Sequence, residues 1–270
     1  MGTVVSFQYK SDLPLSEGLS SHTTSVRLQE NGFCIALHRA SDKSIYLMEQ
    51  HDFDGNYTIR EKLAFLWETA KKWETGKACM TVCSRINSQV PAALHSERNQ
   101  DFYLPLLTEE PYNYQIFTEE VKPYGLWNIS GWNKNLYAQL REQFPQYRLR
   151  SEMYVLLQLL SGWEGRAKLL LFLEKNYLRL VAEKDGKLLG ANGFEFNNKN
   201  DFLYYSVGFA QTLFGGLEGV ELYLTGDIEP SSLLYVSLQK YFTNIHFPDT
   251  GHTSLQHQLH RFCDLLYEED

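Results

Sequence analysis

The chain has 270 residues, of which 43% are hydrophobic and 14% aromatic, so it can bury a sizeable core and is not a disordered protein. Its formal net charge of −8 argues against a nucleic-acid binder, because such proteins need a basic surface that displaces counterions from phosphates. Its four cysteines are too sparse for a disulfide framework. Cys79 and Cys83, about 13 Å apart along one strand, are interpreted as buried structural thiols and not as metal ligands.

The start of the chain has no basic head followed by an apolar segment, so no secretory signal is evident. The longest apolar stretch, KLLLFLEKNYLRLV (168–181), is interrupted by charges and is too short to span a bilayer. We therefore expect a cytoplasmic protein without membrane insertion. Residues 1–22 are polar, contain Pro14 and Gly18, and are predicted to form a leader or lid.

Three runs between residues 23 and 53 alternate apolar and polar side chains, which predicts three antiparallel strands. Asn31-Gly32 and Ser41-Asp42-Lys43 separate the runs and predict tight turns. A helix follows, because apolar residues then recur at spacings of four, three, four and three: Ile59, Leu63, Leu66, Ala70 and Trp73. Gly76 is expected to end this helix as a left-handed cap, and ACMTVCS (78–84) predicts a short buried strand.

The middle of the chain predicts two further strands in YNYQIFTEEVKPYGLWNISGW (112–132). A helix over 133–144 is expected to end at Pro145. A short strand at 147–153 and a helix over 154–163, ended by Gly162, complete this region.

The later part of the chain repeats the opening order of elements. Residues 168–196 predict three strands, residues 201–214 a helix ended by Gly215-Gly216, and residues 220–227 a buried strand. Beyond them we predict a helix over 231–242 with Ser231 or Ser232 as its N-cap. A strand at 244–247 and a final helix at 254–267 follow.

The two regions superpose without a gap at an offset of 143, which places Ser25 on Lys168, Phe53 on Phe196 and Ala78 on Glu221. Few residues are identical, but the element lengths agree over about sixty residues, which is a sign of an internal repeat of a large unit. We therefore predict two related domains, at 23–165 and 166–270.

Two domains that each open strand–strand–strand–helix–strand resemble the RNase H-like, actin-like ATPase fold. This superfamily includes actin, heat-shock chaperones, sugar kinases and the bacterial actin-like proteins of pilus assembly and type II secretion. VELYLTGDIEPSSLLYVSLQKYF (220–242) resembles its adenosine-loop region, and SQVPAALHSERNQDFYLPLL (88–107) resembles the pilus-type branch. The chain looks most similar to an uncharacterised bacterial family with this α/β fold and a mixed sheet in each domain.

The resemblance implies where a nucleotide would bind. In the actin-like fold the phosphate loops are the turns between the first and second strands of each domain. Here those turns are LQENGF (28–33), with Glu30, Asn31 and Gly32, and LEKNYL (173–178), with Lys175 and Asn176. The adenosine-like loop would supply three more residues, Thr225, Gly226 and Asp227.

These loops depart from the Asp-x-Gly pattern of the superfamily. The second turn lacks glycine, whose missing side chain lets backbone N–H groups approach phosphate oxygens. Asp227 stands where a second glycine is expected, and its carboxylate would repel phosphates. We therefore expect degenerate nucleotide chemistry, with no catalytic or metal-binding residues and no firm site for ATP and Mg²⁺.

Asp185-Gly186 is the strongest turn dipeptide in the chain and is a competing candidate for a phosphate loop. It lies one turn beyond the phosphate-loop position and matches Asp42-Lys43 in the first domain. We interpret it as a type I′ hairpin turn, for which Asp-Gly is strongly preferred.

Two other polar groups are weighed as metal sites. His257 and His260 share a helix face near His252 and could bind zinc, but solvent-facing histidines are favoured. Asp52, Asp54 and Asn56 resemble a calcium loop without its closing glutamate, so a turn with an N-cap at Thr58 is favoured.

Three hypotheses for function follow. The first is a bacterial pseudo-ATPase that acts as a scaffold or assembly component with protein partners. The second is an active ATPase or kinase that uses Glu30, Lys175, Asp185 and Asp227. The third is a protein-binding module that uses the aromatic segments EEPYNYQIF and KPYGLWNISGW.

Overall fold

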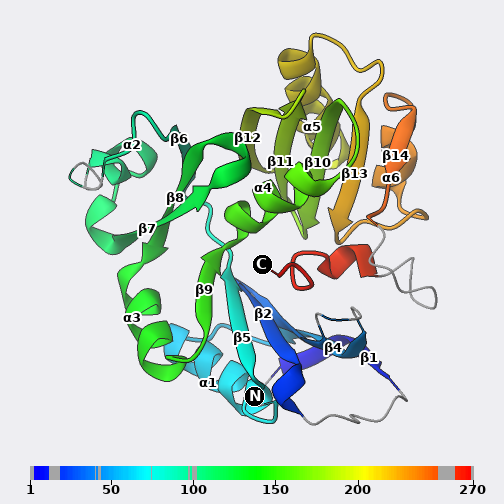
Figure 1. The fold of residues 1–270 in the computed structure, drawn as a ribbon. Helices are drawn as coiled ribbons and strands as arrows, with labels where there is room; N and C mark the ends of the chain where they lie inside the picture. Colours follow the sequence, from blue (N-terminus) through cyan, green and yellow to red (C-terminus); the bar gives the residue numbers. More distant parts are fainter. Residues whose placement is uncertain are drawn as a thin grey trace.

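The computed structural model describes residues 3–11, 19–39, 41, 44–73, 75–96, 98, 102–248 and 259–268. The described chain forms three sheets, with six, five and three strands. Figure 1 shows the two larger sheets in separate lobes, and the smallest sheet to one side of them.

The first sheet has the order β1-β4-β3-β2-β5-β9. Its three predicted antiparallel strands are confirmed, and the helix α1, Ile59–Ala70, connects the third of them to β5. Residues expected to form a leader or lid instead contribute the edge strand β1, which pairs antiparallel with β4. The strands are β1 Thr3–Lys10, β2 Thr23–Gln29, β3 Gly32–His38, β4 Ile45–Phe53, β5 Lys77–Val82 and β9 Arg148–Ser151.

The second sheet has the order β12-β11-β10-β13-β14 and confirms the predicted later strands. The helix α5, Lys199–Phe214, leads from β12 to β13, and α6, Leu233–Leu238, leads from β13 to β14. The strands are β10 Ala167–Glu174, β11 Tyr177–Lys184, β12 Lys187–Glu195, β13 Glu221–Gly226 and β14 Asn244–His246. The topology therefore matches β4-β3-β2-β5-β9 strand for strand.

The registers of the two sheets correct the constant offset of 143. The two-residue turns close with Gln29 opposite Gly32 and Glu174 opposite Tyr177, so these hairpins correspond at an offset of 145 (174 − 29). Asp52 and Glu195, which pair with Gly32 and Tyr177, correspond at 143 (195 − 52). The first half therefore has two more residues between its second and third strands, where a longer connection replaces the tight turn.

Asp185-Gly186 is a hairpin turn, as predicted. It joins β11 to β12 between the paired residues Lys184 and Lys187. Both turn residues have positive φ, 49° and 76°, as a type I′ turn requires. Asp42-Lys43, its predicted counterpart, lies outside the described residues.

Two of the predicted helix caps are confirmed, and a third is wrong. Thr58 caps α1 in a capping box with Glu61, as expected, and Gly215 ends α5 in the left-handed conformation. The role predicted for Gly76 is wrong, because α1 ends at Ala70 with Lys71 as its C-cap. A Cβ at Gly76 would lie 2.2 Å from the Ser20 carbonyl oxygen, so this glycine allows close chain approach.

The smallest sheet has the order β6-β8-β7 and extends the first half between β5 and β9. Its strands β7 and β8 and the helix α3 were predicted, whereas β6 and the single-turn helix α2 were not. The elements are β6 Asn87–Pro91, α2 Leu104–Leu107, β7 Tyr114–Val121, β8 Leu126–Asn133 and α3 Lys134–Gln143. Short 3₁₀ turns occupy Leu19–Ser21, Pro111–Asn113, Lys122–Tyr124 and His260–Phe262.

The helix α4, Glu152–Gly162, connects the two halves and lies between them (Figure 1). It is apolar on most of its circumference, which is typical of a fully buried helix. Its side chains share one core cluster with Val121 and Leu126 of the smallest sheet and with Leu170 and Phe172 of β10. The two halves are therefore joined by a continuous apolar core.

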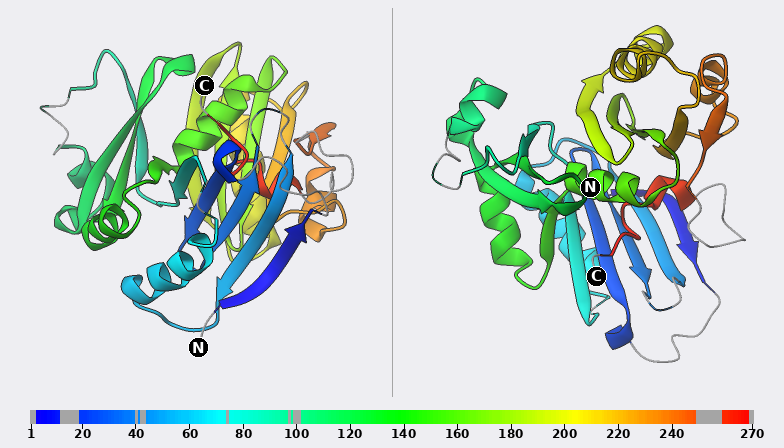
Figure 2. Two further views of the ribbon diagram at one scale, coloured as in Figure 1. Left: turned by 60° about the horizontal axis from the view of Figure 1, so that its bottom comes forward. Right: turned by 45° about the horizontal axis from the view of Figure 1, so that its top comes forward.

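The end of the chain returns to the first sheet. Leu259, Phe262 and Leu265 pack with Cys34 and Met48 in one core cluster. Both views in Figure 2 show this red segment beside the blue strands of the first sheet. Sequence position assigns these residues to the second predicted domain, but they cover a face of the first. Residues 254–258 of the predicted last helix lie outside the described chain.

Candidate functional site

A cavity of about 390 Å³ lies between the first hairpins of the two halves. Its walls come from the β2–β3 turn, the start of α1, the chain after β5, the smallest sheet and the β10–β11 turn. The volume is within the range of small-molecule sites. The cavity therefore occupies the place that the predicted phosphate turns define.

The structure brings four of the predicted site residues together at this cavity: Glu30, Asn31, Lys175 and Asn176. It does not bring the other four to the cavity lining: Gly32, Thr225, Gly226 and Asp227. Asp185 is also distant, because its turn is at the other end of β11, about 25 Å along an eight-residue strand.

Gly32 and Gly226 both have structural reasons for lacking a side chain. A Cβ at Gly32 would lie 2.3 Å from the His51 carbonyl oxygen of the neighbouring strand. A Cβ at Gly226, whose φ is +77°, would lie 2.1 Å from the Leu173 carbonyl oxygen. Close backbone packing within each sheet therefore accounts for these two glycines without a nucleotide.

The adenosine-like loop is tied to the end of the chain. Asp227 accepts a hydrogen bond from Arg261 at 2.7 Å, and the Ile228 carbonyl oxygen is bonded to the His260 ring. Thr225 is fully buried opposite Phe172 in the β10–β13 ladder. Neither Thr225 nor Asp227 projects into the cavity between the hairpins.

The mouth of the cavity carries ion pairs that connect the two halves. Arg85, just before β6, pairs with Glu30 at 3.1 Å and also with Glu195 at the end of β12. Lys175 lies 3.5 Å from Asp52, across from the β3–β4 side of the first sheet. The Lys62 ammonium donates to the Glu30 carbonyl oxygen at 2.7 Å. The cationic groups at the mouth therefore already have partners within the chain.

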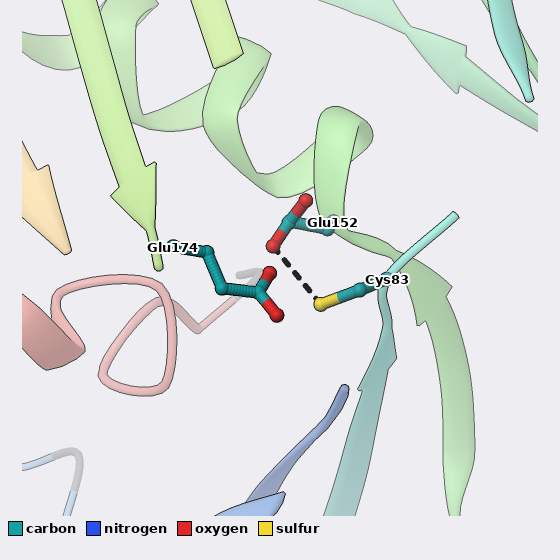
Figure 3. A group of neighbouring side chains, drawn as sticks. All are labelled: Cys83, Glu152 and Glu174. Carbon is teal, nitrogen blue, oxygen red and sulfur yellow. Dashed lines mark hydrogen bonds between the residues drawn. The ribbon is translucent and has the colours of Figure 1, made fainter. Parts of the chain in front are cut away.

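Cys83, Glu152 and Glu174 lie close together, as Figure 3 shows, and Cys83 and Glu174 line the cavity. They come from the end of β5, the first turn of α4 and the end of β10. The Cys83 thiol donates to the Glu152 carboxylate at 2.9 Å. Arg179 of β11 is ion-paired with Glu152 and lies 3.6 Å from Glu174. These three groups and Arg179 form a charge cluster shared by both halves, which we call the floor cluster. Glu152 and Arg179 are buried, whereas Cys83 and Glu174 are half-buried.

Burial determines the protonation of this cluster. It raises the pKa of the Cys83 thiol well above its ordinary value, and the neighbouring Glu152 carboxylate adds to that effect. Burial also raises the pKa of Glu152 to about 7, although the charge of Arg179 opposes the shift. The thiol is consequently a neutral hydrogen-bond donor at neutral pH.

The same three side chains offer one ligand atom each within 4.8 Å, a spacing that would suit a divalent metal. Such an ion would need the thiolate form of Cys83, which its raised pKa disfavours. It would also lie beside the Arg179 guanidinium, which is already paired with Glu152. The donor set fits a hydrogen-bonded ion-pair cluster better than a metal centre.

A family model matches residues 18–245. The chain belongs to this family, which is described as a protein of unknown function (DUF3822). Among curated proteins, none matches this DUF3822 sequence.

Solved structures establish the fold of this DUF3822 protein. A Bacteroides thetaiotaomicron protein with actin-like ATPase fold and unknown function is 21% identical, with a TM-score of 0.76 over 93% of this chain and 97% of that chain. The PilM-PilN type IV pilus biogenesis complex is 10% identical, with a TM-score of 0.55 over 92% of this chain and 98% of that chain. The predicted actin-like ATPase fold is confirmed.

No helix within the described ranges has both the length and the apolarity that a bilayer crossing requires.

Neither Arg85 nor the floor cluster was predicted as part of the site. The available signal was a charged residue between apolar neighbours, as in YLRLV around Arg179. Such a residue in a strand is normally assigned to a solvent-facing side. Here Arg179 is only 2% exposed, so an arginine within an apolar strand pointed to a buried ion pair.

The other predicted polar groups have local roles. The Asp54 carboxylate accepts from the Tyr57 hydroxyl and Asp52 pairs with Lys175, so these aspartates do not converge as calcium ligands would. His260 is fully buried, which corrects its predicted solvent-facing position. Its predicted companions His252 and His257 lie outside the described residues.

The four cysteines are free thiols, consistent with the absence of a disulfide framework. Cys34 and Cys263 are buried, whereas Cys79 and Cys83 are partly exposed, so the interpretation of the latter two as buried thiols needs correction. Cys83 lies beyond the end of β5 and is held by Glu152.

Proposed function

We propose that this protein is a pseudo-ATPase of the actin-like fold that acts as a scaffold or assembly component in the bacterial cytoplasm. The observation that carries the proposal is the pairing of charges at the mouth of the cavity. Arg85 bridges Glu30 and Glu195, and Lys175 faces Asp52. These cations are compensated by carboxylates. The β10–β11 turn has no glycine that would admit a phosphate chain, and Gly32 beside the β2–β3 turn packs against β4 and does not line the cavity.

The ion pairing of the carboxylates in and beneath the cavity also supports a loss of ATP hydrolysis. A site for Mg-ATP needs carboxylates that are free to orient the metal and its waters. Glu152 and Glu174 instead face Arg179, and Glu30 faces Arg85. Binding a magnesium–phosphate complex here would first require these ion pairs to break.

A protein partner is supported by two further observations. The PilM-PilN structure is described as a type IV pilus biogenesis complex, so that protein of similar fold assembles with a partner. In this chain, large apolar side chains are exposed beside the smallest sheet: Phe102 is 70%, Leu106 81% and Tyr112 68% exposed. Exposed apolar groups that gather in one region are typical of interaction surfaces.

Titration calorimetry and phosphate-release measurements with Mg-ATP test the loss of nucleotide chemistry. We expect no binding heat at micromolar nucleotide and no release of phosphate above the rate without protein. Micromolar binding accompanied by hydrolysis would overturn the proposal. A pull-down of a candidate partner with and without nucleotide then shows whether partner binding depends on the cleft.

The second candidate function is an active ATPase or kinase with an atypical site. The cavity volume of about 390 Å³ favours it, as do the Lys62, Arg85 and Lys175 side chains that line the cavity. Of the residues first considered for this activity, Glu30 and Lys175 line the cavity but Asp185 and Asp227 do not. Turnover that disappears in the double variant Glu30→Ala and Lys175→Ala would support this candidate.

A further inference from the structure

A second cavity, of about 460 Å³, separates two open sheet edges. One edge is β6 of the smallest sheet, and the other is β12 of the second sheet. Ser88, Gln89 and Pro91 line one side and residues 186–191 the other, with residues 123–126 between them. We name this cavity the edge groove.

The edge groove is closed at one end and open at the other. Arg85, two residues before β6, is ion-paired with Glu195, the last residue of β12. The groove lies at the opposite end of β12, beside Lys187 and the turn that precedes it. The strands β6 and β12 approach each other but belong to different sheets.

The hydrogen-bond register of β6 leaves backbone groups facing outward. Gly131 donates to the Ile86 carbonyl oxygen at 2.9 Å, and Ala92 donates to that of Gly125 at 3.0 Å. Residues alternate between bonded and non-bonded positions along an antiparallel pair. In this register Asn87 and Gln89 occupy the non-bonded positions, so their N–H and C=O groups point away from β8.

The same analysis applies to β12. Phe196 donates to the Asn176 carbonyl oxygen at 2.9 Å, so Ala191 and Gly193 occupy non-bonded positions opposite β11. The Gly193 N–H is bonded to the Asn192 side chain at 2.8 Å. Ala191 therefore presents its N–H and C=O at the open edge, and it lines the groove. An edge with such groups is a template for an extended chain.

The floor and rim of the groove indicate the chemistry of its occupant. The bottom of the edge groove is apolar. It is formed by three residues that belong to, or pack against, the core cluster joining the two halves: Leu126, Leu188 and Ala191. Lys187 lines the rim, Lys122 adjoins the lining residue Pro123, and in the described part of the chain neither makes an ion pair. In a chain of net charge −8, this local basic rim complements an acidic segment.

We propose that the edge groove binds an extended, acidic segment of a partner protein, which adds as a β-strand to the open edge of β12 on the side that faces β6. This inference rests on the proposed scaffold function and names the surface that would perform it. Main-chain hydrogen bonds to Ala191 provide affinity, and Lys187 selects acidic side chains. The exposed apolar side chains near Tyr112 lie outside the groove lining and are not required.

Selection of a displayed library of random short peptides on the purified full chain tests the proposal. We expect the selected peptides to be acidic and to protect residues 187–193 from amide hydrogen exchange. Ala191→Pro removes the outward N–H but keeps the β11–β12 hydrogen bonds, and should weaken binding about tenfold or more. Ala191→Val is the matched control, because it retains that N–H and should bind nearly as well.

Charge is tested separately on exposed lysines. Lys187→Glu should weaken acidic peptides severalfold and reduce the salt dependence of binding, whereas Lys240→Glu, which lies outside the groove, should not. If Ala191→Pro does not fold, as circular dichroism would show, Lys187→Glu decides the outcome alone.

The outcomes of these experiments distinguish a failure of the groove proposal from a failure of the proposed scaffold function. Peptides that bind but are unaffected by either groove variant would overturn the groove and leave the scaffold function standing. Selection of no binder would count against both. A second copy of the chain in the groove, seen as a dimer in light scattering that Ala191→Pro abolishes, would overturn the acidic-segment proposal.

Discussion

The first hairpins of the two halves, β2–β3 and β10–β11, share a two-residue turn and a common register but bury different side chains. At the offset of 145, Arg27 corresponds to Phe172 and Cys34 corresponds to Arg179. The corresponding residues also meet, because the Arg27 guanidinium lies 5.2 Å from the centre of the Phe172 ring. One backbone pattern therefore supports two different arrangements of charge.

What covers each hairpin explains the difference. The face of β10–β11 that carries Phe172 and Val181 packs on the apolar helix α4. The corresponding face of β2–β3 packs on the end of the chain, where Asp264 is fully buried and pairs with Arg27 at 2.6 Å. The repeat of topology thus specifies where strands lie, while the covering segment determines which residue types can be buried there.

The greatest loss of stability should come from breaking the ion pair between Arg27 of the first hairpin and Asp264 of the chain end. Either Arg27→Met or Asp264→Leu leaves one buried charge without its partner and should lower the free energy of unfolding by about 3–5 kcal/mol. Urea unfolding of each variant measures this loss. The double variant should recover most of it, because two apolar side chains would imitate the apolar contact that Phe172 makes in the second half.

A single variant within about 1 kcal/mol of the natural chain would contradict this account. Such a result would mean that the Arg27–Asp264 pair is solvated in solution, and that the two hairpins are covered more alike than the structure shows.

A smaller loss of stability is expected at the ends of the equivalent strands β5 and β13. Thr225 and Thr81 occupy equivalent positions, at an offset of 144 (225 − 81), so the next residues, Gly226 and Val82, also correspond. Of these two, Gly226 has a positive φ, and its Cβ position lies 2.1 Å from a backbone oxygen. Gly226→Ala should therefore lower the free energy of unfolding by about 2–4 kcal/mol, since strain and overlap add. Thermal or urea unfolding measures the change.

Gly215→Ala is the matched control for backbone strain. Gly215 also has a φ of +77°, but no atom of the residues that the structure describes lies within 4 Å of its Cβ position. Its loss should be about 1 kcal/mol. Equal losses at the two glycines would show that the Leu173 backbone moves aside, and that the bend after β13 is not imposed by close packing.

The least effect is expected for the pH dependence contributed by Glu119, a half-buried residue of β7. Glu119 accepts hydrogen bonds from the backbone N–H and hydroxyl of Ser151, but burial raises its pKa from 4.5 to about 7. Between these values the folded chain binds more protons than the unfolded chain, so this group contributes stability at low pH that is lost as pH rises toward 7. Glu119→Gln should remove that contribution.

The measurement is the free energy of unfolding across this pH range in both proteins. Glu152, with a pKa of about 7, acts in the same direction as Glu119. His38, whose pKa burial lowers to about 4, acts in the opposite direction, since its unfolded form binds the proton between pH 4 and 6.5. An unchanged pH slope in Glu119→Gln would show that this carboxyl group is ionised throughout.

Most of the secondary structure and its order could be predicted from local sequence patterns. Alternation around Val26 and Phe33, helical spacing from Ile59 to Ala70, and the Asp185-Gly186 turn are local signals, because each depends on backbone preferences and on one buried side. The similar order of elements in the two halves was sufficient to predict the actin-like fold.

The assembly of the site depends on contacts between segments that are far apart in the sequence. Alternation in β2 predicts that Arg27 faces solvent, but the chain end, more than 230 residues later, covers that face and buries the charge. Arg85, Glu152 and Arg179 likewise meet only after the halves pack. Periodicity reports which face of an element is apolar; it carries no information on which distant segment covers the other face or neutralises its charges.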